Sequence, residues 1–310
     1  MPNRKRVSVV RLSATLAALA LVVSACSGGS PSGSSGPSTP NPTPVVTPTS
    51  APTGDVIAHP TGATEIVLRY DVGGGFVPME FFAAHVPQFT MYGDGTVVFV
   101  SQVVDTSMKQ AQGVGTNQPL RTLKLPESEV QALLLFALRD CGLAVAKTEY
   151  ANQMVADAPT TTFTVNAEGD SKTVSAYALG FTNEPGPDTA ILNALGRLAE
   201  RLGNFDQNGA ITSEPYVAKA FRATLTWQQG GVQGVQISAW PWEDLTVADF
   251  TFPADPNQLP QGIHLITADQ VAALNIAGAE NGLNSGFWTQ AGDGRTFSLS
   301  IRPLLPEEKE

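Results

Sequence analysis

Cysteine and histidine are scarce in this chain of 310 residues, which holds two cysteines and three histidines. Two cysteines, Cys26 and Cys141, are too few for a disulfide framework. His59, His85 and His264 form no His-x-x-x-His pattern and no pairing with a cysteine that would hold zinc. We therefore expect no metal ion, no other cofactor and no core held together by disulfide bonds.

Basic residues are also few, since 18 Lys and Arg stand against 28 Asp and Glu. Residues 1–26 contain four of the basic residues and none of the acidic ones, so the chain that follows carries a formal charge of −14. Nucleic acids and anionic lipid surfaces are bound through a basic footprint. The charge balance therefore argues against nucleic acid as a partner.

Motifs of covalent catalysis are missing from the region predicted to fold. It contains neither Gly-x-Ser-x-Gly nor the Ser-x-x-Lys pattern of penicillin-binding proteins. A Ser-His-Asp triad is recognised by its geometry, so one can still be assembled from distant residues. We predict no catalytic residues, and an envelope-acting hydrolase with an unrecognised active site stays open as the alternative.

Long apolar runs are absent too. The longest, Leu12 to Val23, has 12 residues, whereas a helix needs roughly 18 or more to cross a bilayer. Asn3-Arg4-Lys5-Arg6 places a positive charge cluster ahead of it. A basic start followed by a short apolar run is typical of an export signal rather than of a mature membrane anchor.

The apolar run ends in Val23-Ser24-Ala25-Cys26, which resembles the lipobox of bacterial lipoprotein signal peptides. The resemblance implies a signal peptide over residues 1–25 and a diacylglyceryl group on Cys26. Each buried methylene contributes ~0.8 kcal/mol and durable anchoring takes two chains, which such a group supplies. It implies a protein held in the bilayer on the outer face of a bacterial cell membrane. The alternative is an ordinary secretory signal with Cys26 as a bystander.

Residues 26–60 follow as the lipidated cysteine and a tether. Of the 28 residues from 27 to 54, 24 are Gly, Ser, Pro or Thr and none is charged. Such a segment cannot bury a core, so we expect it to be disordered. Fully extended it reaches on the order of 80 Å, enough to hold a domain away from the membrane.

Periodicity after the tether predicts an N-terminal α+β domain over residues 61–205. Alternating apolar residues and Gly-Asp turns predict strands at residues 65–71, 89–92, 96–104, 160–167 and 172–178. Apolar residues at helical spacing predict amphipathic helices over residues 125–142 and 188–203, each ending at a glycine.

A polar, aperiodic stretch over residues 204–214 predicts a boundary, and residues 213–310 a C-terminal α+β domain. We expect a half-buried strand over 217–227, turned by Gly230-Gly231 into a strand over 235–239. A capping box from Thr267 to Gln270 starts a short helix. Residues 287–288 pair with 296–302, and Glu307 onwards is a solvated tail. Grouped hairpins with interspersed helices predict an α+β fold with antiparallel sheets and two or three amphipathic helices, in two small domains.

Several of these segments resemble a group of uncharacterised bacterial lipoproteins. They are Tyr92-Gly93-Asp94-Gly95-Thr96-Val97-Val98, the helix of 125–142, Trp240-Pro241 and Arg302-Pro303-Leu304-Leu305-Pro306-Glu307. The similarity covers most of residues 64–307. It implies a lipid-anchored envelope protein and transfers no catalytic residues.

All four tryptophans lie in the last hundred residues, and Trp240 and Trp242 are the candidate binding surface. In an extended Trp-Pro-Trp the two indoles project to the same side, because residues two apart share a face. They form either a platform for a glycan or peptide or a wedge packed into a core or sheet edge. We therefore predict a non-enzymatic envelope lipoprotein that binds an envelope glycan or protein.

Overall fold

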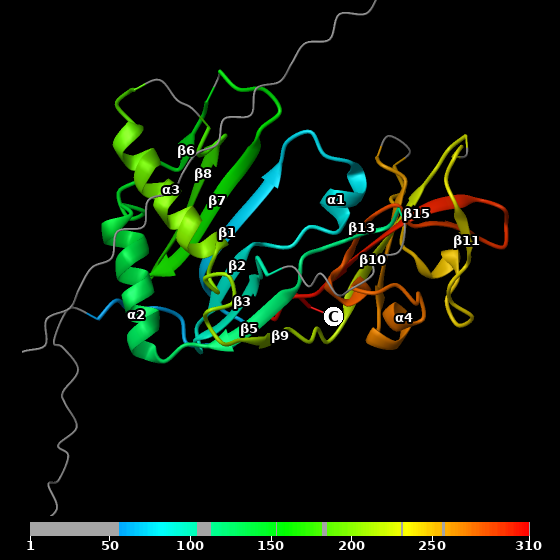
Figure 1. The fold of residues 1–310 in the computed structure, drawn as a ribbon, viewed down its shortest axis with the longest axis horizontal. Helices are drawn as coiled ribbons and strands as arrows, with labels where there is room; N and C mark the ends of the chain where they lie inside the picture. The colour runs from blue at the N-terminus through cyan, green and yellow to red at the C-terminus, as the bar shows by residue number, and fades with distance from the viewer. Residues whose placement is uncertain are drawn as a thin grey trace, which may run out of the picture. The chain divides into compact units, whose positions relative to one another are not determined.

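The computed structural model describes residues 56–103, 113–152, 154–181, 185–230, 232–255 and 258–309. The signal peptide, Cys26 and the tether up to residue 55 lie outside these residues, so the predictions made for them stay predictions. The described chain contains two sheets (Figure 1), and antiparallel pairing dominates both. Together with helices between the strands, this confirms the predicted α+β class.

The first sheet is built from the N-terminal part of the described chain. Its strand order is β6-β8-β7-β1-β2-β3-β5-β9. The strands are β1 (Ile66–Gly74), β2 (Phe89–Tyr92), β3 (Thr96–Val100), β5 (Leu120–Lys124), β6 (Glu149–Tyr150), β7 (Pro159–Ala167), β8 (Asp170–Tyr177) and β9 (Glu214–Pro215). Both predicted hairpins, β2 with β3 and β7 with β8, are confirmed.

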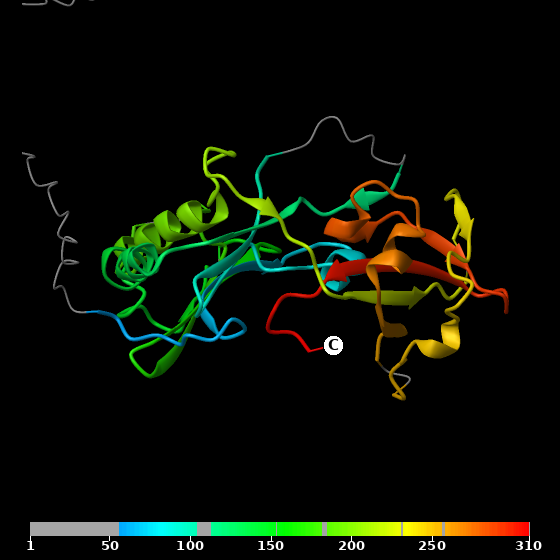
Figure 2. The ribbon, with the colours of Figure 1, turned by 90° about the horizontal axis from the view of Figure 1, so that it is seen from below.

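Helices α2 (Glu127–Leu135) and α3 (Thr189–Gly203) lie against the first sheet (Figure 2). Helix α2 continues into a π-helical turn, η1 (Phe136–Asp140), so one helical segment spans most of the predicted 125–142. Its predicted apolar stripe faces the core, where five of its residues are buried: Val130, Leu133, Leu134, Ala137 and Cys141. A short helix, α1 (Met79–Ala83), follows β1 and has no buried residue.

The second sheet has the strand order β11-β14-β15-β10-β12. Its strands are β10 (Phe221–Trp227), β11 (Ile237–Ala239), β12 (Gln261–Ile266), β14 (Trp288–Gln290) and β15 (Thr296–Pro303), with β4 (Gly115–Thr116) and β13 (Leu283–Ser285) joined beside β15. The predicted closing hairpin is confirmed as β14 with β15. Short helical segments are η2 (Val247–Asp249), α4 (Ala268–Ala272) and η3 (Ala279–Asn281). The capping box is confirmed at α4, where the backbone N–H of Gln270 donates to Thr267 Oγ1 at 3.2 Å.

The expected hairpin around Gly230-Gly231 is wrong. Strand β10 pairs with β12 on one side and β15 on the other, whereas β11 runs parallel to β14. Because β10 is central, Thr224 is buried although the alternating pattern assigns it to solvent. Tertiary pairing therefore overrides the half-buried pattern that the local sequence shows.

The polar segment over residues 204–214, predicted as a boundary, is mostly exposed but contributes two buried residues, Phe205 and Asp206. Phe205 packs against Phe89 and Phe99, with ring centroids 4.8 and 5.3 Å apart. Asp206 is only 2% exposed and accepts a hydrogen bond from Ser101 Oγ at 2.6 Å. Strand β9 then pairs with β5 of the first sheet. The division into two domains at this point stays a prediction.

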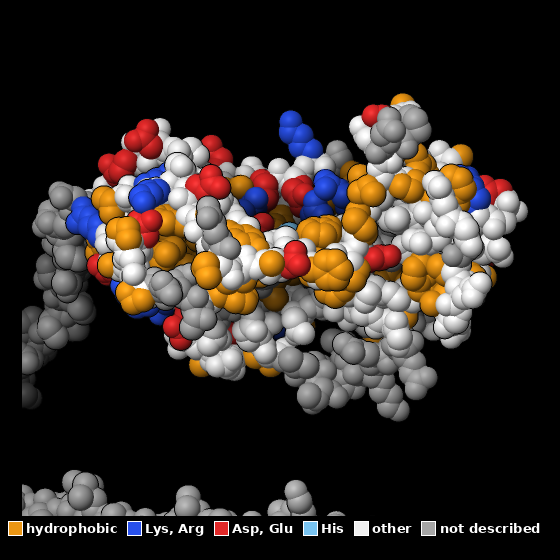
Figure 3. All heavy atoms as spheres, turned by 90° about the horizontal axis from the view of Figure 1, so that it is seen from above, with side chains coloured by type: hydrophobic (Ala, Val, Ile, Leu, Met, Phe, Trp, Pro, Cys, Tyr) orange, Lys and Arg blue, Asp and Glu red, His pale blue; other side chains and the backbone are white. Residues whose placement is uncertain are grey.

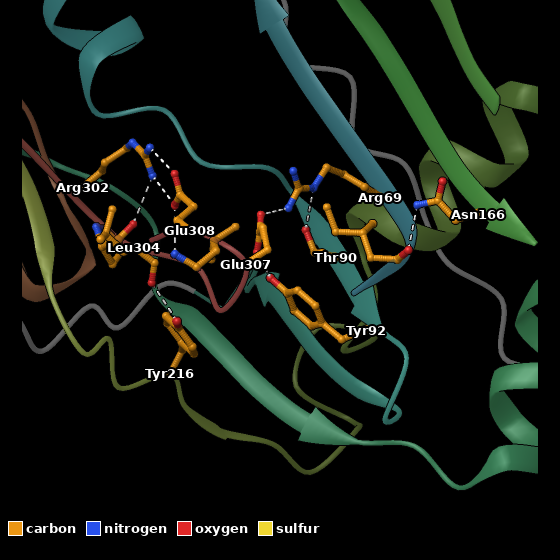
Figure 4. Close-up of polar contacts among 12 residues, drawn as sticks. Arg69, Thr90, Tyr92, Asn166, Tyr216, Arg302, Leu304, Glu307 and Glu308 are labelled. Atoms are coloured by element: carbon orange, nitrogen blue, oxygen red, sulfur yellow. Dashed lines mark hydrogen bonds and ion pairs between the residues drawn. The ribbon is translucent and has the colours of Figure 1, made fainter. Parts of the chain in front are cut away.

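The prediction of a solvated tail from Glu307 onwards is also wrong, because the carboxylates of Glu307 and Glu308 are bound by other side chains (Figure 4). We call the five residues involved the C-terminal clamp: Arg69, Tyr92, Arg302, Glu307 and Glu308. Glu307 accepts from the Arg69 guanidinium of β1 and from the Tyr92 hydroxyl of β2, the latter at 2.6 Å. Tyr92 is fully buried. Its pKa is raised mainly by this burial and also by its hydrogen bond to Glu307. A buried donor needs a partner, which explains why an acidic terminus folds back.

Glu308 makes the second half of the clamp within the last strand and turn. Arg302 Nη1 donates to Glu308 Oε2 at 2.7 Å, and the Leu305 amide donates to the same oxygen at 2.9 Å. Partial burial opposes ionisation of Glu308, but these hydrogen bonds and the charges of Arg302 and Arg222 outweigh it and lower the pKa of the carboxyl. The clamp therefore holds Glu308 in its charged form.

Candidate functional site

Trp240-Pro241-Trp242 follows the edge strand β11, and the structure brings the two indoles into contact. Their ring centroids lie 5.4 Å apart at an interplanar angle of 81°. Trp242 is 5% exposed, and its Nε1 donates to the Gln270 carbonyl at 2.8 Å. Trp240 is only partly buried, and its Nε1 donates to the Leu245 carbonyl at 2.6 Å. Trp242 is therefore the buried indole of the pair, and Trp240 is the accessible one.

The indoles line an open cavity of about 720 Å³ between residues 240–252 and the β14–β15 turn. Four aromatic side chains contribute to its wall: Trp240, Trp242, Phe250 and Phe252. Phe250 is buried and stacks on Trp242 with centroids 6.2 Å apart, whereas Phe252 is partly buried. Ligand sites are typically concave, with aromatic walls and a few polar groups.

Charged side chains also line this cavity. Arg295 Nη2 lies 2.7 Å from Asp293 Oδ2, and the Arg295 hydrogen bond lowers the pKa of the Asp293 carboxyl. The same guanidinium lies 5.3 Å from the centroid of the Phe297 ring. Glu243 is exposed at the other side of the aromatic wall. The cavity therefore offers both a guanidinium donor and carboxylate acceptors to a ligand.

Phe250, Phe252 and Arg295 were not predicted as site residues. Phe250 and Phe252 flank Thr251, which is bridged to Ile263 of β12. Arg295 comes to the cavity because β11 pairs with β14, which brings the β14–β15 turn beside the Trp-Pro-Trp segment. This parallel pairing joins residues about fifty apart, so no local pattern could show it. The only local signal was the aromatic content of residues 240–252.

The histidines lie apart from one another. His59 Nε2 is 3.1 Å from Glu127, and the His264 ring packs 5.4 Å from that of Phe250. His85 Nε2 lies 2.6 Å from Asp71 Oδ1, and His85 lines a separate cavity of about 450 Å³. Among the described residues, no serine, threonine or cysteine hydrogen-bonds to His85, and no group of three or more His, Cys, Asp or Glu is arranged to hold a metal.

Comparison with known proteins adds no functional assignment. No family model matches the chain, and no curated protein or solved structure matches it either. Within the described ranges, no helix combines the length and apolar character needed to traverse a bilayer.

Proposed function

We propose that this protein is a lipid-anchored binding protein on the outer face of a bacterial membrane, and that its aromatic cavity holds an envelope glycan. The observation that carries the proposal is the cavity itself, about 720 Å³ with Trp240 and Phe252 accessible in its wall and charged groups beside them. The lipobox resemblance at Cys26 supports the anchoring, and the long tether gives the domain reach.

The chemistry of a sugar suits this arrangement. Its C–H face is apolar and packs on an aromatic ring, as large aromatic side chains favour flat apolar contact with a polar edge. Its hydroxyls donate to carboxylates such as Asp293 and Glu243 and accept from the guanidinium of Arg295. An uncharged glycan also avoids the repulsion that the net negative charge of the protein imposes on an acidic ligand.

Replacing Trp240 by alanine is expected to weaken glycan binding. A stacked aromatic ring contributes about 0.5–1.5 kcal/mol, so the Kd should rise by about two- to twelvefold. We would titrate uncharged oligosaccharides of N-acetylglucosamine into the protein and follow the intrinsic tryptophan fluorescence. Phe76→Ala is the matched control, because Phe76 is 92% exposed and does not line the cavity. Equal affinities for wild type and Trp240→Ala would contradict the proposal.

Cys26→Ser is expected to release the protein from the membrane, because serine cannot take the diacylglyceryl group that the lipobox resemblance implies. Fractionation should move the variant from the membrane to the soluble fraction, and mass spectrometry should find an acylated Cys26 at the wild-type N-terminus. Cys141→Ser, a change of the only other cysteine, should leave the protein in the membrane. Membrane retention of Cys26→Ser would overturn the anchoring part of the proposal.

The second candidate function is an envelope-acting hydrolase, favoured by one observation. His85 bonded to Asp71 resembles the base and orienting carboxylate of a triad. The pair has no hydroxyl or thiol hydrogen-bonded to it within the described residues. Release of soluble fragments from peptidoglycan by wild type, and its loss in His85→Ala, would favour this candidate over binding alone.

A further inference from the structure

A second candidate site lies away from the aromatic cavity, in the 450 Å³ cavity that contains His85. Helix α1 and strands β4 and β13 contribute to it, through Phe81, Thr116 and Asn284. Carboxamide side chains dominate its lining: Gln88, Gln102, Asn117, Gln118 and Asn284. No lysine, arginine, aspartate or glutamate lines it.

A second cavity, of about 670 Å³, shares the lining residues Gln88 and Gln102 with the first. It adds two more carboxamides, Asn204 and Asn208, after the end of α3. Glu200 is its one charged lining residue. We call the two cavities together the carboxamide groove.

Part of the groove is held in a fixed geometry. Asn284, 9% exposed, donates from Nδ2 to Asn117 Oδ1 at 2.9 Å, and Asn117 donates from Nδ2 to the Ala84 carbonyl at 2.8 Å. The side chains of Gln88 and Gln118, in contrast, make no hydrogen bond to any described residue. An ordered floor thus carries carboxamides that are available to a ligand.

A carboxamide presents one acceptor oxygen and one NH₂ donor, the same pair of functions that a peptide group presents. The side chains of Gln88 and Gln118 can therefore pair with peptide groups of an extended chain. Uncharged donors and acceptors do not demand a charged partner, and the single carboxylate of Glu200 favours a neutral or basic ligand over an acidic one.

One exposed apolar side chain lines the groove. It is Phe81 of α1, 42% exposed; Phe76, Val77 and Phe82 of the same segment are exposed as well but do not line the cavity. Exposed hydrophobic side chains gather on the face shown in Figure 3. Contiguous exposed apolar side chains mark interaction sites more often than chance placement does. Phe81 would receive an apolar side chain of a peptide whose backbone pairs with the floor.

We propose that the carboxamide groove binds an extended, neutral or basic peptide segment with an apolar side chain at Phe81. A peptide fits the groove because its backbone can pair with the carboxamides while one of its side chains packs on Phe81. The inference is independent of glycan binding in the aromatic cavity.

The test uses the full chain carrying Cys26→Ser and the blocked peptide acetyl-Ala-Ala-Leu-Ala-Ala-amide as the probe. Side-chain NH₂ signals of glutamine and asparagine are resolved in ¹H–¹⁵N NMR spectra, so each carboxamide reports on its own contacts. We expect the signals of Gln88 and Gln118 to shift on titration. Gln88→Met and Phe81→Ala should each raise the Kd by about three- to tenfold, the loss typical of one neutral hydrogen bond or apolar contact.

Two controls make the result specific. Gln233→Met changes an exposed glutamine outside the groove and should leave the Kd unchanged. Trp240→Ala should also leave peptide binding unchanged, so that failure here is distinguishable from failure of glycan binding. Absence of shifts at Gln88 and Gln118, equal shifts at Gln233, or shifts with glycan fragments instead of the peptide would overturn the proposal.

Discussion

Leu134→Ala is expected to lower the free energy of unfolding by about 2–5 kcal/mol, the cost of a large cavity in a core that cannot collapse fully. Leu134 is fully buried on α2, in the core between that helix and the first sheet. Equilibrium unfolding in urea, followed by far-UV circular dichroism, measures the change. The midpoint should fall while the slope stays constant, because a core cavity alters stability rather than the area exposed.

Leu135→Ala is the matched control. Leu135 is the next residue of the same helix and is 40% exposed. Both changes alter helix propensity alike, so their difference isolates the effect of burial. We expect Leu135→Ala to change the free energy of unfolding by less than about 1 kcal/mol. Similar losses in the two variants would mean that the buried face of α2 has been assigned wrongly.

Trp242→Ala is expected to cost about 3–5 kcal/mol of stability. The indole is almost fully buried in the core of the second sheet, where it contacts the rings of Trp240 and Phe250. Its removal also leaves the Gln270 carbonyl without the donor it has in the folded protein. Thermal unfolding with near-UV circular dichroism would report the loss of tertiary packing directly.

Trp240→Ala provides the comparison within the same segment. Trp240 keeps part of its surface exposed, so the stability it loses on truncation should be clearly smaller than that of Trp242→Ala. The two indoles must therefore be changed one at a time, since a double variant mixes a core defect with a binding defect. A larger loss of stability for Trp240→Ala than for Trp242→Ala would mean that Trp240, and not Trp242, is the buried indole.

Local signals explain what the sequence predicts correctly. The hairpins around Gly93-Asp94-Gly95 and residues 168–169 and the apolar stripe of α2 depend on residues close together in the chain. Helix α1 shows no buried face, and β4, β6 and β9 have two residues each. Hydrophobic periodicity becomes visible only when several residues share one buried face, so these elements could not be predicted from the sequence.

The candidate site shows the same limit. The extended Trp240-Pro241-Trp242 segment predicted that the two indoles project to the same side, and their rings are in contact in the structure. Which indole is buried depends on α4, whose Gln270 carbonyl accepts from Trp242. The cavity depends further on the parallel pairing of β11 with β14. These are contacts between distant segments, and a single sequence carries no local trace of them.

The C-terminal clamp sets the order in which the fold can be completed. Its bond between Arg69 and Glu307 joins residues 238 apart. Closing a loop of that length costs roughly 5 kcal/mol of chain entropy, so the contact forms only once other structure has brought the ends together. Ribosomes make the N-terminal part first, so Tyr92 is made long before its partner Glu307. The hydroxyl of Tyr92 on the second strand of the first sheet thus lacks its carboxylate partner until Glu307 has been made.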